Sequence, residues 1–103
     1  MKSQKAKVIR DISAEINPFI KSQVGAIVEV LAFLDKGTRV YVSSELGAED
    51  RETGVDAILV HAPYSRTVHP AVDIVIESGF TAVVDGVTYR GNDIYSHEEL
   101  QLL

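Results

Sequence analysis

The chain has 103 residues, of which 46% are apolar and 24% charged, and its formal net charge is −5. This length is typical of one domain rather than two, and the apolar fraction excludes a disordered chain. The chain has no cysteine. A disulfide scaffold, a thiolate metal site and a cysteine nucleophile are therefore excluded.

Charge is unevenly distributed along the chain. Residues 1–39 hold seven Lys and Arg against four acids, a net charge of +3, whereas residues 40–103 hold three Arg against eleven acids, a net charge of −8. A basic arm on an acidic body favours self-association or docking on a neighbouring protein. It does not supply the continuous basic face that a duplex-DNA binder needs.

The N-terminal segment 1–16 is predicted to be a basic arm with a short amphipathic helix. Residues 1–7 are polar and are expected to be frayed or to lie on a partner. In residues 8–16 the apolar side chains Val8, Ile9, Ile12 and Ile16 have helical spacing, and Pro18 ends the helix. The alternative is that Val8 and Ile9 start an edge strand. Residues 17–103 then form a single β-domain.

Strand patterns follow from Val24 onward. Residues 24–34 predict a long strand, residues 35–38 a glycine turn, and residues 39–46 a half-buried strand that forms a hairpin with the strand before it. Residues 45–54 hold four acids and two glycines, which predicts an exposed loop. The centre of residues 55–62 is apolar on both faces, and this segment is expected to form a buried strand.

The C-terminal third is predicted to be a meander of three antiparallel strands from Val72 to about Arg90. Ser78-Gly79 and Asp85-Gly86 have the composition of two-residue hairpin turns. A further turn is expected at residues 91–93. Ser96 with Glu99 fits a capping box for one helical or 3₁₀ turn, after which Leu100, Leu102 and Leu103 dock on the core.

This count of six or seven short strands predicts a mainly-β fold, a small antiparallel barrel with a short N-terminal helix and a C-terminal helical turn. The strand order and spacing resemble those of SH3-like barrels. The likeness concerns architecture alone and implies no activity.

The first candidate binding segment is the loop from His61 to Pro70. In one interpretation Arg66 pairs with a phosphate or carboxylate, Tyr64 stacks on the ligand and His69 donates a hydrogen bond. In the other the segment is a proline-bounded loop, in which His61 ends a strand and His69 faces solvent.

The second candidate is the segment from Thr88 to Tyr95, which combines arginine, tyrosine and asparagine with Gly91. The alternative is a hairpin end at which Tyr95 caps the core. If Arg66 and Arg90 converge, the two segments form one anion pocket. The predicted ligand-binding residues are Tyr64, Arg66, His69, Tyr89, Arg90 and Asn92.

Other chemistry finds little support in the sequence. The three histidines lack a metal-ligand spacing, and neither a nucleophile elbow nor a glycine-rich phosphate loop is present. We expect no catalytic residues, metal or cofactor. No apolar stretch reaches the roughly 20 residues of a membrane span, so a soluble, cytoplasmic protein without a membrane partner is expected.

The sequence thus predicts a non-enzymatic binding or assembly module that docks on a protein partner or on copies of itself. The alternative function is a small-ligand binder that captures a phosphorylated or nucleotide-like molecule through the arginine and tyrosine residues named above.

Overall fold

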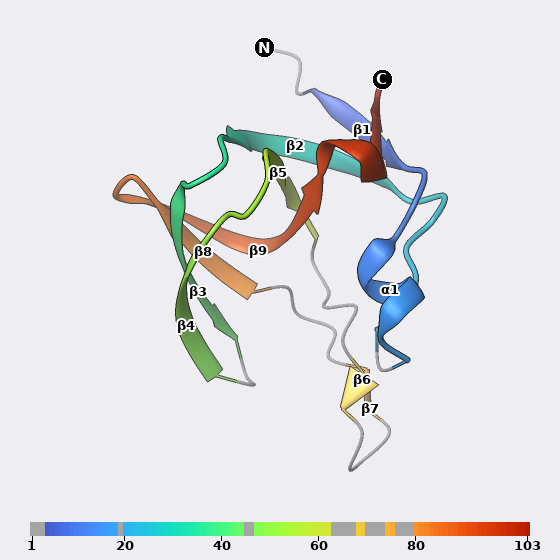
Figure 1. Cartoon of the computed structure of the whole chain (residues 1–103), viewed down its shortest axis with the longest axis horizontal. Helices are drawn as coiled ribbons and strands as arrows, with labels where there is room; N and C mark the ends of the chain where they lie inside the picture. The colour runs from blue at the N-terminus through green and yellow to red at the C-terminus, as the bar shows by residue number, and fades with distance from the viewer. Residues whose placement is uncertain (1–3, 19, 45–46, 63–67, 70–73, 76–79) are drawn as a thin grey trace.

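The computed structural model describes residues 4–18, 20–44, 47–62, 68–69, 74–75 and 80–103. Its elements are β1 (Lys5–Val8), α1 (Ile12–Ile16), β2 (Ile27–Leu34), β3 (Arg39–Ser44), β4 (Gly47–Glu52), β5 (Ala57–His61), β6 (Val68–His69), β7 (Ile74–Val75), β8 (Phe80–Val84), β9 (Val87–Ser96), a 3₁₀ helix (His97–Glu99) and β10 (Leu100–Leu102). Eight strands form one antiparallel sheet in the order β10-β1-β2-β5-β9-β8-β3-β4 (Figure 1). Strands β6 and β7 pair with each other in a second, two-stranded sheet.

The N-terminal segment is part of the main sheet. Strand β1 lies between β2 and β10, so residues 5–8 are not frayed. The helix begins at Ile12, where Asp11 caps it by accepting a hydrogen bond from the Ala14 amide at 3.1 Å. The prediction of a helix from residue 8 is wrong because Lys-Ala-Lys-Val alternates with the period of a strand. Val8 does belong to a strand, as the alternative had it, but that strand is interior.

Strands β2 and β3 do not form the predicted hairpin, although the turn between them does form. Gly37 has a φ of 90°, and the Thr38 amide donates to the Asp35 carbonyl at 3.0 Å. The same turn is tied to the end of β4, because the Gly37 amide donates to the Thr53 carbonyl at 2.7 Å. Strand β2 therefore pairs with β1 and β5, and β3 pairs with β4 and β8.

Strand β4 replaces the loop predicted at residues 45–54. It pairs with β3 along its whole length, from Arg39 opposite Glu52 to Ser44 opposite Gly47. All six of its residues are exposed. The prediction was wrong because strand formation depends on context, and a charged sequence is acceptable where a strand lies at the edge of a sheet.

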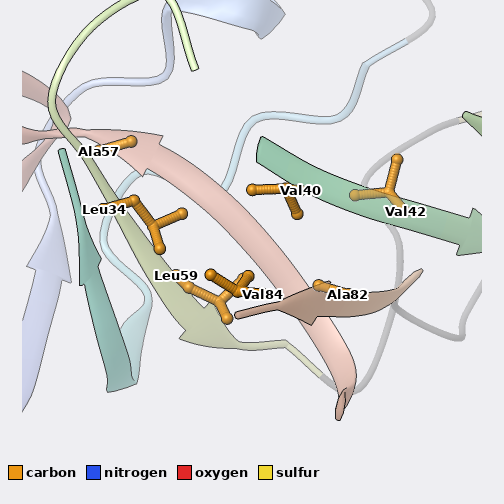
Figure 2. Packing of buried hydrophobic residues seen from close by; sticks show 7 residues of the cluster. All are labelled: Leu34, Val40, Val42, Ala57, Leu59, Ala82 and Val84. Atoms are coloured by element: carbon orange, nitrogen blue, oxygen red, sulfur yellow. The ribbon is translucent and has the colours of Figure 1, made fainter. Parts of the chain in front are cut away.

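Strand β5 is buried on both faces, as its sequence predicted, because it separates two cores. The first core cluster consists of Leu34, Val40, Val42, Ala57, Leu59, Ala82 and Val84 (Figure 2). The second core cluster consists of Ala6, Val8, Ile58, Val60, Tyr95 and Leu100. Alternate side chains of β5 enter alternate clusters, which is the geometry of a strand with both faces covered.

Strands β8 and β9 confirm one of the two predicted hairpins. Asp85 and Gly86 have φ values of 49° and 78°, which is the backbone of a type I′ turn. The three-stranded meander is wrong, because the second neighbour of β8 is β3 and the short strand β7 pairs with β6. The Ser78-Gly79 turn lies outside the described residues.

The turn predicted at residues 91–93 is instead a bulge within β9. Gly91 has a φ of 67°, and the register between β8 and β9 shifts between Phe80 and Ala82. The predicted 3₁₀ turn is confirmed, with the Ser96 amide donating to Glu99 Oε1 at 2.9 Å. Leu100 is buried as expected, but Leu102 and Leu103 are exposed and do not dock on the core.

The main sheet does not close into a barrel. Its strand order leaves β10 and β4 as edges. The prediction of a mainly-β fold is confirmed, whereas the SH3-like barrel stays a prediction. In the described part of the chain, no helix has the length and apolar character needed to cross a membrane.

Candidate functional site

The two tyrosines of the second candidate segment pack against the two core clusters. Tyr95 is 2% exposed within the second core cluster, and Tyr89 is half-buried against the first. Tyr95 is buried in the core, as that alternative had it, but the segment is a bulged strand and not the end of a hairpin. Tyr95 offers no surface to a ligand or partner.

Asn92 is buried beneath the bulge and bridges its two sides. Its Nδ2 donates to the Tyr89 carbonyl at 2.6 Å and to the Phe80 carbonyl at 3.3 Å. The amide thereby binds one carbonyl on each of the two strands beside the bulge. Its Oδ1 is buried and finds no hydrogen-bond donor in the part of the chain that the structure describes.

Arg90 lies on the same strand and is exposed. It takes part in none of the ion pairs found among the described residues. Tyr64 and Arg66 lie outside those residues, and His69 is described only as part of strand β6. The convergence of Arg66 with Arg90 therefore stays a prediction.

The other two histidines are exposed and lie on different elements, His61 on β5 and His97 in the 3₁₀ helix. His61 ends β5 and is opposite Glu29 of β2, whereas the His97 ring lies 6.2 Å from the ring of Phe33. Among the described residues, no three histidines or carboxylates lie close enough together to hold a metal ion.

A different surface stands out on β1, β2 and the C-terminal residue. Lys5 and Lys7 are exposed on the face of the sheet opposite the second core cluster. In register, Lys7 lies opposite Ile27 of β2, and Ile27 is 54% exposed. Leu103 and Ile9 flank the lysines and are 62% and 49% exposed. We call these five residues the lysine–aliphatic face.

Other charged side chains lie near this face, and one of them, Arg10, forms ion pairs. Arg10 Nε donates to Glu15 Oε2 at 2.9 Å, and Arg10 Nη1 lies 4.0 Å from Glu98 Oε2. The hydrogen bond and the charge of Glu15 raise the pKa of Arg10. Lys5 and Lys7 form no such ion pair among the described residues. Lys5 lies opposite the exposed Glu29 of β2 in register, whereas Lys7 has no acid directly across the sheet.

Two buried carboxylates hold this region together. Glu99 Oε2 accepts from the Ile12 amide at 2.9 Å, while its Oε1 accepts from the Ser96 amide and hydroxyl. Asp11 Oδ2 accepts from the Gln23 amide at 3.1 Å. These bonds join the start of α1 to the C-terminal 3₁₀ helix and to the segment before β2. They fix the position of β1 and with it the lysine–aliphatic face.

Sequence reasoning missed this face because residues 1–7 were interpreted as an arm outside the fold. The alternation of lysine with small apolar residues over Lys5–Val8 is the signal that could have found it. With β1 recognised as a strand, its lysines fall on one face. Their neighbours on β2 and near β10 depend on strand pairing, which the sequence does not specify.

Comparisons of the chain with protein-family models, with curated proteins and with solved structures find no match.

Proposed function

We propose that the chain is a non-enzymatic binding and assembly module that contacts other proteins through the lysine–aliphatic face. The observation that carries this proposal is the exposure of Ile9, Ile27 and Leu103, each about half exposed or more, around two lysines. The outer face of an antiparallel sheet is ordinarily polar. A group of aliphatic side chains on such a face is a feature of interaction surfaces.

The chemistry of the face defines the partner. Aliphatic side chains gain free energy when a partner removes them from water. Lysines direct encounter with a negatively charged surface and raise the association rate. The partner surface is therefore a protein surface that combines apolar and acidic side chains.

The fold supplies a rigid platform for such a contact. Strand β1 is hydrogen-bonded on both sides, to β2 and to β10. The sheet curves around the first core cluster, which lies among β2, β5, β9, β8 and β3 (Figure 2). This curvature supports an SH3-like fold. The small-anion pocket stays an alternative prediction, since two of its residues lie outside the described chain.

Site-specific photocrosslinking tests the proposal. A photoreactive benzoylphenylalanine replaces Ile27 in the full chain, and a matched control carries it at Val87, which is 50% exposed in the β8–β9 hairpin (Figure 1). In extracts of the source cells we expect protein adducts from position 27 and not from position 87. Adding Lys5→Glu and Lys7→Glu should remove these adducts.

Two results would contradict the proposal. One is an equal yield of adducts from positions 27 and 87, and the other is a yield at position 27 that charge reversal leaves unchanged. Point substitutions are preferable to truncation, because removing residues 1–16 would delete an interior strand of the sheet.

A further inference from the structure

We infer that the β10 edge of the sheet pairs with β10 of a second copy of this chain. The inference rests on the proposed function and identifies a second copy of the chain as one partner with which the module assembles. It starts from a contrast between the two edges of the main sheet. On β4 the four consecutive residues Glu49, Asp50, Arg51 and Glu52 are charged and exposed, whereas β10 (Leu100–Leu102) has no charged residue.

Charge on an edge strand is a common protection against pairing with another chain. The β4 edge has this protection and the β10 edge lacks it. Leu102 and Leu103 at the β10 edge are also 49% and 62% exposed. The β10 edge therefore carries no charge and exposes two leucines.

The hydrogen bonds of β10 define which backbone groups point away from β1. The Leu103 amide donates to the Lys5 carbonyl at 2.9 Å, so the backbone N–H of Leu103 points toward β1. Hydrogen-bonding direction alternates along an antiparallel strand, which turns the amide and carbonyl of Leu102 and the carbonyl of Leu100 outward. The Leu100 amide is occupied, because it donates to the His97 carbonyl.

These outward groups are complementary to a second copy in the antiparallel orientation. With Gln101 opposite Gln101 of the second copy, the Leu102 amide of each chain meets the Leu100 carbonyl of the other. The pairing is two-fold symmetric, which is the commonest symmetry of protein dimers. It also brings Leu102 beside Leu100 of the second copy, on the side of the second core cluster.

Electrostatic repulsion does not oppose this pairing at the contact. The nearest lysine of β1 in register is Lys7, opposite Gln101. In the dimer the two copies of Lys7 are three strand spacings apart, about 14 Å at the usual spacing. This exceeds the Debye length of about 8 Å at physiological salt. Pairing β10 with the charged β4 edge of a second copy would instead bring acids to a strand that has no basic residue.

The symmetry has a consequence for the proposed function. The two-fold axis is perpendicular to the sheet, so the same face of both copies lies on one side. The lysine–aliphatic faces become adjacent, and the dimer presents four lysines to a partner in place of two.

Cysteine crosslinking of the full chain tests the pairing, because the natural chain has no cysteine. Gln101 is exposed, and in the inferred register Gln101→Cys places two Cα atoms about 4.5–5.5 Å apart, within the range of a disulfide. The control variant is Asp50→Cys on the β4 edge. Under mild oxidation we expect Gln101→Cys to double its mass from 11.3 kDa and Asp50→Cys to stay monomeric.

A second variant tests the edge without a crosslink. Leu102→Lys adds a charge to the β10 edge at a side chain that is already half exposed. Light scattering should show a dimer for the natural chain and a monomer for Leu102→Lys, with circular dichroism spectra that confirm the same fold.

Three results would overturn the inference: a natural chain that stays monomeric, equal crosslinking of Gln101→Cys and Asp50→Cys, and mixed disulfides as the main product when the two variants are combined. The last result would mean head-to-tail pairing of β10 with β4.

The proposed function can fail independently of this inference. Adducts at position 27 without a β10 dimer would support the proposed function and contradict the β10 pairing. A β10 dimer without adducts at position 27 would support the pairing and contradict the proposed function.

Discussion

At the scale of single residues, Glu99 joins two segments that are far apart in the sequence. Its side chain is 6% exposed and accepts hydrogen bonds from the Ile12 amide and from Ser96. Removing a buried acceptor leaves buried N–H groups without a partner, which is more costly than the loss of an exposed contact. The neighbouring Glu98 is exposed and lies 4.0 Å from Arg10.

We therefore expect Glu99→Ala to lower the free energy of unfolding by about 2–3 kcal/mol, in the range of hydrogen bonds to charged groups. Glu98→Ala is the matched control and should change it by no more than about 0.5 kcal/mol, as is usual for surface substitutions. Urea titration followed by circular dichroism measures both. Equal effects of the two substitutions would mean that Glu99 does not anchor the start of α1.

The sequence predicted part of the role of Glu99. Its bond to the Ser96 amide follows from a spacing of three residues, which is a local pattern. Its bond to the Ile12 amide joins positions 87 residues apart and depends on β10 packing beside β1. No local pattern encodes such a contact.

At the scale of elements, turn residues determined where β8 and β9 reverse direction. Gly86 has a φ of 78°, which favours glycine, while Gly54 does not have a positive φ of this kind. A Cβ atom at either position would meet no atom within 4 Å. The two glycines therefore differ in backbone conformation and not in the space around them.

Gly86→Ala should destabilise the protein by about 1–2 kcal/mol, the cost of a left-handed conformation for a residue with a Cβ. Gly54→Ala should be neutral or stabilise it by up to about 1 kcal/mol, because alanine restricts the unfolded chain. Thermal unfolding of both variants checks this difference. A loss of stability in Gly54→Ala equal to that in Gly86→Ala would contradict the assignment of the turn.

Elements without a specific turn were predicted less well. Strand β4 has the composition of a loop, and its pairing with β3 became evident only from the fold. The amphipathic pattern of residues 8–16 was divided between β1 and α1, because Asp11 caps the helix at Ile12. Apolar spacing over nine residues fits more than one arrangement when a cap interrupts it.

At the scale of the whole molecule, β5 joins the two core clusters. Ile58 is 1% exposed in the second cluster and Leu59 is fully buried in the first. The two residues are adjacent in sequence but point to opposite faces. Loss of either side chain therefore weakens the same strand from a different side.

Ile58→Ala and Leu59→Ala should each destabilise the protein by about 2–5 kcal/mol, as is usual for truncation of a buried aliphatic side chain. Because β5 belongs to both clusters, calorimetry should find one cooperative transition for each variant, at a lower temperature than for the natural chain. Two separate transitions in either variant would show that the clusters unfold independently.

The sequence by itself determined what depends on neighbouring residues: the mainly-β class, the buried strand around Ile58, the Asp85-Gly86 turn and the 3₁₀ turn after Ser96. The tertiary structure decided the strand order, the open sheet with unlike edges and the lysine–aliphatic face. The physical reason is that alternation shows which residues share a face of a strand but not which strand lies beside it. Strand partners are chosen by packing and hydrogen bonds between segments that are distant in the chain.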